Sequence, residues 1–329
     1  MAGLAFAGTS LLLGSFDQPE AQPTPHGPIA LASVTPPPSS TPSATATPLP
    51  TVAASATPAP TPAPVPLPAL LGAIGDSYTQ AWSVSAAYLH DHPQFSWAVG
   101  TSGTDGVSSL LERLRGLGAA PAVVDAATSG RKMNDAPRQA DLVVAASRKL
   151  AAGKTAYVTF ELGTNDLCAS PDPMTPPVDF ETQLQTAVAI LQEGLPAGSR
   201  ILMLAVPDFP HFRVITQADP TARATLSESK NANLCAPYLG RYSAAAMTQA
   251  NSYLSQYDAS LAAACSGINA TPGAAGQLHC TYDAALLAES DFTIKDMSTV
   301  DYFHPSLAGQ ARMAADAWQA DVWASWTKG

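Results

Sequence analysis

The stretch ALLGAIGDSYTQ, residues 69–80, decides the fold, because an apolar run ends abruptly at Gly75-Asp76-Ser77. A short apolar run bounded by a glycine turn is typical of a buried strand. Three further runs have this form, and a polar loop follows each of them: AVVDAAT (122–128), TAYVTFELG (155–163) and RILMLAVPD (200–208). These four runs are predicted to be strands of one sheet.

Amphipathic helices are predicted between and after these strands. Apolar side chains recur three and four residues apart from Phe180 to Leu195, from Tyr242 to Leu261 and from Leu307 to Val322. This spacing places each set on one helical face. Strands that alternate with helices predict an α/β fold, in which helices cover both faces of a mainly parallel sheet.

The N-terminal part of the chain has a different composition. Residues 17–68 consist largely of Pro, Thr, Ala, Ser and Val, which predicts a disordered, extended linker. Residues 1–16 resemble the apolar part of a secretory signal, although no Lys or Arg precedes Arg113, so this segment is expected to be truncated. Residues 69–329 remain for one folded domain, and the protein is expected to be secreted or held at the cell surface.

The net charge limits the possible partners, and the cysteines indicate disulfides and not a metal site. The net charge of −10 argues against nucleic acid and against docking on an anionic membrane, and no run is long enough for a transmembrane segment. The four cysteines lack the close spacing of a zinc site, and in a secreted chain an even number favours disulfides. Of three possible pairings we prefer Cys265–Cys280, which closes a short glycine-rich loop, with Cys168–Cys235.

Ser77 is a candidate nucleophile, since ligands of parallel sheets bind beyond the carboxyl ends of the strands. A serine hydroxyl needs a base, and DYFHPS near the C-terminus offers His304 with Asp301 three residues before it. This carboxylate can orient the imidazole, as in a catalytic triad. Each motif alone is more often a turn or the cap of a helix. Asp76 is expected only to shape the turn.

Two further loops offer hydrogen-bond donors. Asn165, in GTND, presents a neutral amide, and Gly130, in TSGRKMND, allows its backbone N–H to approach a substrate. Such donors stabilise the oxyanion that forms during acyl transfer.

The order Ser77, Gly130, Asn165, Asp301, His304 resembles that of the SGNH hydrolases, the GDSL family of lipases and esterases, over about residues 70–326. The resemblance implies a three-layer α/β/α sandwich with a short, flavodoxin-like sheet. It also implies a Ser77, His304, Asp301 triad, an oxyanion hole of Ser77, Gly130 and Asn165, and no metal or cofactor.

Finer features resemble the phospholipase B branch of that family: FSWAVGTSG, SGRKMNDAPRQA, GTNDLC and DYFHPSLAGQ. Tyr78 and Thr164 stand where the family more often has Leu and Gly. They are candidates for the substrate cleft with His211, although Tyr78 is also expected to pack behind the turn. Glu161 either repels acidic substrates or is paired within the fold.

The predicted function is hydrolysis of carboxylic esters through an acyl-enzyme, with acyl esters of lipids or phospholipids as substrates. The alternative is a carbohydrate acetyl esterase, and a third possibility is an inert surface-binding module that keeps the fold. The expected partner is a small-molecule or lipid ester, and the oligomeric state stays open.

Overall fold

The computed structural model describes residues 65–168, 173–228, 230–231, 233–239, 243–285, 287 and 291–324. The predicted signal segment, 1–16, lies outside the described residues, as does the predicted linker, 17–68, except for its last four residues. Within these four, Val65 and Leu67 pack against the hydrophobic core.

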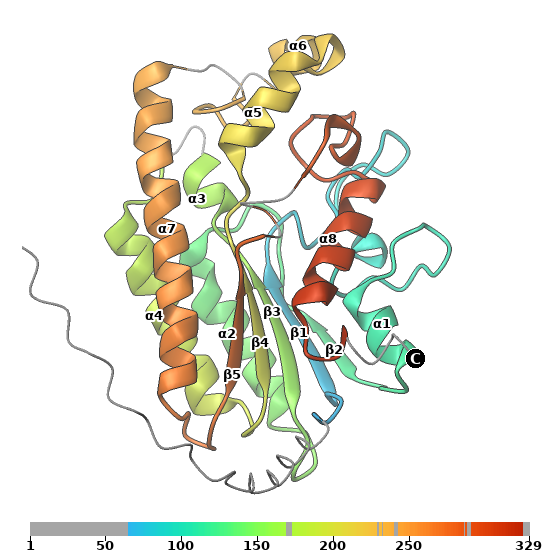
Figure 1. Ribbon diagram of the computed structural model, residues 1–329, viewed down its shortest axis with the longest axis vertical. Coiled ribbons are helices and arrows are strands. Elements are labelled where there is room, and N and C mark those ends of the chain that lie inside the picture. The colour runs from blue at the N-terminus through green and yellow to red at the C-terminus, as the bar shows by residue number, and fades with distance from the viewer. Residues whose placement is uncertain are drawn as a thin grey trace, which may run out of the picture. The chain divides into compact units, whose positions relative to one another are not determined.

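A sheet of five parallel strands forms the centre of the fold (Figure 1). The strands lie in the order β2-β1-β3-β4-β5. Their bounds are β1 (Leu70–Gly75), β2 (Ala122–Asp125), β3 (Ala156–Glu161), β4 (Arg200–Leu204) and β5 (His279–Asp283). β1 and β3 are buried along their whole length, as expected for parallel strands with both faces covered.

Helices cover both faces of the sheet, which confirms the predicted three-layer α/β/α sandwich (Figure 1). One layer contains α2 (Ala136–Ser147), α4 (Pro177–Gly194) and α7 (Ala244–Ala270), which pack on one another, and the other contains α1 (Leu110–Gly116) and α8 (Leu307–Ala320). The shorter helices are α3 (Thr164–Cys168), α5 (Phe209–Ala218) and α6 (Pro220–Ser227).

Helix α8 is tied to the first strand region through Gln310, which is fully buried. Its amide nitrogen donates to the carbonyl oxygen of Tyr78 at 2.9 Å, and its amide oxygen accepts the N–H of Trp97 at 2.9 Å. Because both bonds are buried, they fix the C-terminal helix beside the turn that follows β1.

The structure differs from the prediction at three places. The run 122–128 was expected to be a buried strand, but only β2 (Ala122–Asp125) forms, and this edge strand is largely exposed. Strand β5 has the sequence HCTYD and was not predicted, because it is a partly exposed edge strand without an apolar run. The side chain of Asn269 bonds both the N–H and the carbonyl of Cys280, at 2.9 and 2.8 Å, along this edge. After β1 the chain forms consecutive turns instead of a helix, with Ala81 and Ser83 at positive φ (49° and 48°).

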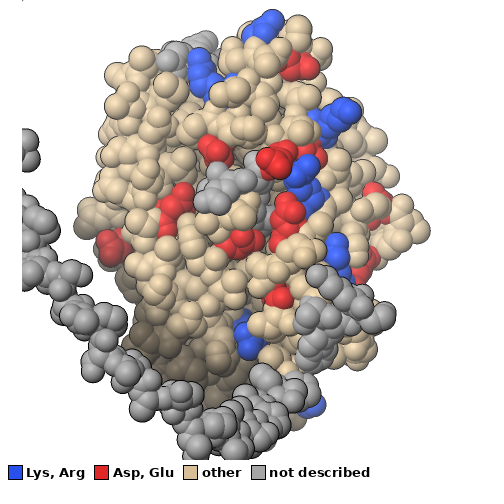
Figure 2. Space-filling view, in the orientation of Figure 1, with Lys and Arg blue, Asp and Glu red and all other residues tan. Residues whose placement is uncertain are grey.

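Two disulfides link parts of this fold. Cys265–Cys280 joins α7 to β5, and Cys168–Cys235 joins the end of α3 to the segment before α7. In the described part of the chain, no helix combines the length and the apolar character that crossing a bilayer requires. On the face shown in Figure 2, the acidic and basic side chains of the described residues are intermixed.

The register of the sheet brings two predicted site loops together. Gly75, the last residue of β1, pairs with Glu161, the last residue of β3. The loop that contains Ser77 and the helix that contains Asn165 therefore begin side by side at the carboxyl edge of the sheet.

Candidate active site

Ser77 lies just beyond the carboxyl end of β1, and only 4% of its surface is exposed. Its Oγ lies 3.0 Å from Nε2 of His304, 227 residues later in the chain. Backbone bonds hold the turn, since the N–H of Gln80 donates to the carbonyl of Asp76 and that of Trp82 to the carbonyl of Ser77, both at 3.0 Å. The serine is thus fixed in the turn itself.

Asp301 holds the other side of the His304 ring. Its Oδ2 lies 2.7 Å from Nδ1 of His304, and its Oδ1 accepts the N–H groups of Phe303 and His304, each at 3.0 Å. Burial alone would raise the pKa of Asp301, but the nearby imidazole and these hydrogen bonds lower it below its usual value. Since an ionised carboxylate only accepts, Nδ1 of His304 donates to it, and in the neutral imidazole Nε2 then faces Ser77 with a lone pair.

Gly130 reaches the same place from the loop after β2, and Asn165 reaches it from α3, which follows β3. Gly130 has a φ of 79°, and a Cβ added there would meet no atom within 4 Å, so the backbone is open to a ligand. Both residues line a cavity of about 330 Å³ together with Ser77 and His304. The other residues that line it are Trp82, Ser129, Leu234 and Phe303.

Asp76 does more than shape the turn. Its Oδ1 accepts the N–H of Tyr78 and its Oδ2 accepts an N–H of the Asn165 amide, both at 3.0 Å. Burial raises the pKa of Asp76 to about 7, against the lowering effects of the Tyr78 N–H and of nearby His304. Since 89 residues separate Asp76 from Asn165, no local pattern in the sequence indicates this contact.

Two further buried carboxyl groups lie behind the site. Asp166 accepts the N–H of Met133 at 2.8 Å, which ties the loop after β2 to α3, and burial raises its pKa to about 6. Glu161, 1% exposed, accepts the hydroxyl of Thr79 at 3.0 Å. Burial, followed by the charge of Asp76, raises the pKa of Glu161 well above its usual value. The structure therefore shows Glu161 paired within the fold, through its hydrogen bond with Thr79.

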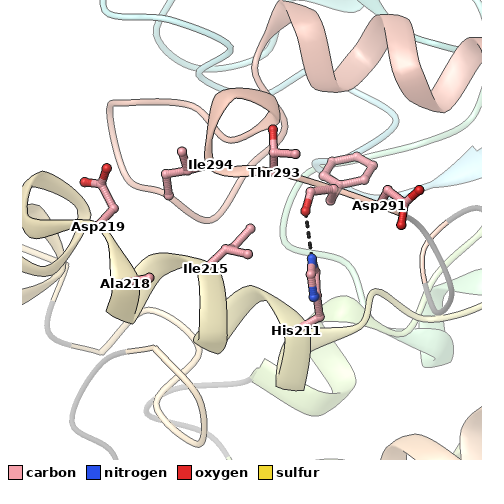
Figure 3. A pocket seen from close by; sticks show the side chains of 8 residues that line it. His211, Ile215, Ala218, Asp219, Asp291, Thr293 and Ile294 are labelled. Atoms are coloured by element: carbon pink, nitrogen blue, oxygen red, sulfur yellow. Dashed lines mark hydrogen bonds between the residues drawn. The ribbon is translucent and has the colours of Figure 1, made fainter.

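Three predicted cleft residues do not line the cavity beside Ser77. Tyr78 is fully buried, and its hydroxyl donates to the carbonyl of Phe303 at 2.8 Å, while Thr164 is buried as well. His211, on α5, lines a separate cavity of about 540 Å³ and bonds the carbonyl of Phe292 through Nε2 at 2.7 Å (Figure 3). This geometry separates His211 from the serine site.

Among the residues that the structure describes, no group of three or more His, Cys, Asp or Glu side chains is arranged to hold a metal ion. The described site includes the Ser77 hydroxyl, the His304 imidazole, the Asn165 amide and carboxyl groups. These are the components of nucleophilic acyl transfer.

Comparison with known proteins identifies one family. A model of the GDSL-like lipase/acylhydrolase family matches residues 73–312. No curated protein matches the chain.

Similar solved structures include TesA, with a TM-score of 0.40, 16% identity, and coverage of 76% of this chain and 97% of that one. The psychrotrophic esterase EstA from Pseudoalteromonas sp., inhibited by monoethylphosphonate, has a TM-score of 0.43, 15% identity, and coverage of 79% and 100%. AlinE4, an SGNH-hydrolase family esterase, has a TM-score of 0.32, 17% identity, and coverage of 64% and 75%.

Proposed function

Because this chain belongs to the GDSL-like lipase/acylhydrolase family and is an ester hydrolase, we propose that Ser77 is its nucleophile. The observation that carries this proposal is the unbroken series of contacts from Ser77 Oγ to His304 at 3.0 Å and from His304 to Asp301 at 2.7 Å. In this mechanism His304 is the general base and Asp301 orients it.

The reaction proceeds in two stages. His304 Nε2 takes the hydroxyl proton of Ser77 while Oγ attacks the ester carbonyl, and the protonated imidazole then gives this proton to the departing alcohol. Water, activated by the same imidazole, releases the acyl group. Asp301 stays ionised throughout, in keeping with its lowered pKa, and stabilises the imidazolium.

The oxyanion of the tetrahedral intermediate lies among three donors, the N–H groups of Ser77 and Gly130 and the amide of Asn165. Support for this assignment comes from the cavity that all three residues line. Preorganised donors act where the charge develops, and the loss of one costs on the order of 10²- to 10³-fold in kcat.

The substrate is an acyl ester of a lipid or phospholipid. Trp82, Leu234 and Phe303 support this choice, since they place apolar groups on the wall of the cavity that contains Ser77. The resemblance to the phospholipase B branch stays a prediction. Acetyl esters of carbohydrates are the second candidate, and a clear preference for p-nitrophenyl acetate over p-nitrophenyl octanoate would favour them.

The protein acts outside the cytoplasm. Two disulfides are in keeping with an oxidising compartment. In this proposal residues 1–16 are a secretory signal segment, 17–68 form a linker, and 69–329 form the hydrolase domain.

Ser77→Ala tests the mechanism. We expect it to abolish hydrolysis of a short-chain p-nitrophenyl ester and covalent labelling by a fluorophosphonate probe. Ser147→Ala is the matched control, since Ser147 is also buried but its hydroxyl bonds the carbonyl of Val144 within α2. An unchanged rate in Ser77→Ala, or a folded parent protein that no probe labels, would exclude the proposal.

A further inference from the structure

The Asn165 amide has two hydrogens, and both are already used in the free enzyme. Its Nδ2 donates to Oδ2 of Asp76 and to the backbone carbonyl of Arg131, each at 3.0 Å. An amide nitrogen carries only two N–H bonds. Asn165 therefore has no spare donor for an oxyanion until one of these two acceptors gives way.

The two acceptors are not equivalent. Asp76 is fully buried, and its second oxygen is held by the N–H of Tyr78 at 3.0 Å. The bond to the Arg131 carbonyl is exposed, and Arg131 itself is exposed beside Gly130. The exposed Arg131 carbonyl can accept a hydrogen bond from water when it loses the Asn165 amide. The buried Asp76 carboxylate would be left without this hydrogen bond and away from water, which is energetically costly.

We propose that Asp76 is a positioning residue, which holds one N–H of Asn165 so that the other, released from the Arg131 carbonyl, donates to the oxyanion. This inference rests on the proposed function, because it assigns Asn165 to the oxyanion hole. The oxyanion takes the place of the Arg131 carbonyl, which occupies the donor in the free enzyme.

The surrounding contacts hold both acceptors of the Asn165 amide, Asp76 and the Arg131 carbonyl, close to it. Asp166, the residue after Asn165, accepts the N–H of Met133 at 2.8 Å. The loop that carries Gly130 and Arg131 is thereby fastened to the same short helix as Asn165. The Arg131 carbonyl is thus close enough to occupy the donor, while Asp76 holds the amide from the side of β1.

Substitutions at Asp76 and Asn165 show whether Asp76 acts through Asn165 or only shapes the turn. If Asp76 acts through Asn165, its removal matters only while Asn165 is present, so the two substitutions are not additive. Misdirecting a donor also costs no more than deleting it. The loss in kcat for Asp76→Ala is therefore bounded by the roughly 10²- to 10³-fold loss expected for Asn165→Ala.

The experiment is a double-mutant cycle on the full chain with p-nitrophenyl butyrate. It compares Asp76→Ala, Asn165→Ala and the double variant, measures kcat and KM separately, and follows thermal unfolding of each protein. Asp76→Asn repeats the cycle with a side chain of the same shape, in case the alanine variant does not fold. Asp321→Asn is the control, because Asp321 accepts the Tyr157 hydroxyl at 2.7 Å at the amino end of β3, away from the site.

We expect Asp76→Ala to lower kcat at least 10-fold with KM changed less than about twofold, and the double variant to be no slower than Asn165→Ala within about twofold. Asp321→Asn should keep the parent kcat. Multiplicative losses in the double variant, or a loss confined to KM, would overturn the positioning role. An active Ser77→Ala variant would instead overturn the proposed function, so the two failures are distinguishable.

Discussion

Replacement of Asp301 by asparagine tests the orientation of His304 with little change in shape. In the structure, Oδ1 accepts two backbone N–H groups, and Oδ2 accepts the proton on Nδ1 of His304. The carbonyl oxygen of an asparagine can keep the two backbone bonds, so its NH₂ group must face Nδ1. That nitrogen then has to accept, and the ring proton moves to Nε2, where it points at Ser77.

The base is then in the wrong tautomer for attack. The same change in a serine protease triad lowers kcat about 10⁴-fold, which corresponds to about 5.5 kcal/mol of barrier, and we expect a similar loss for Asp301→Asn. The assay is steady-state hydrolysis of p-nitrophenyl butyrate, with thermal unfolding to show that the fold persists. A kcat within tenfold of the parent in a folded variant would refute the reasoning.

Three further predictions concern stability. Gly163→Ala should destabilise the fold by roughly 2–6 kcal/mol in denaturant unfolding, since φ is 133° and the new Cβ would lie 2.5 Å from Cγ2 of Val206. If adding Val206→Ala restored full stability, the contact with Val206 alone would explain the loss, and the positive φ would contribute no strain. Replacing Cys265 and Cys280 together by serine should cost about 3 kcal/mol, because their disulfide closes a loop with a sequence separation of 15, and an unchanged denaturation midpoint would count against this. Burial raises the pKa of Asp321 to about 7, so its contribution to stability is fully present below about pH 4 and is lost as the pH rises to 7. The Tm of Asp321→Asn minus the Tm of the parent should therefore be larger at pH 8 than at pH 4.5. An equal Tm difference at the two pH values would exclude this titration.

Much of the architecture follows from local patterns. The runs that became β1, β3 and β4 are continuous and apolar because both faces of a parallel sheet are covered, and this property is visible in the sequence. Strand β5 lacks this signal. It lies at an edge, where the neighbouring β4 and the side chain of Asn269 bond its backbone, and neither contact leaves a periodic trace in HCTYD.

Part of the candidate site could likewise be predicted from the sequence, and part could not. Ser77, Gly130, Asn165 and His304 stand in polar loops directly after apolar runs or before a helix, so chemistry and position together indicated them, and the structure places all four around one cavity. The contact between Asp76 and Asn165 depends on how two strands pair. Such a contact is a property of the register, which a single sequence does not reveal.

The separation of Ser77 from His304 has a consequence for biosynthesis. The two residues are 227 positions apart, and Gln310 of α8 must dock on Tyr78 to fix the C-terminal segment there. At roughly 5–20 residues per second, a ribosome needs on the order of 10 to 45 s to pass from one to the other. Under the proposed mechanism, the growing chain carries a nucleophile without a base throughout that interval. On this proposal, ester hydrolysis begins only when the last segment folds into place and brings His304 to Ser77.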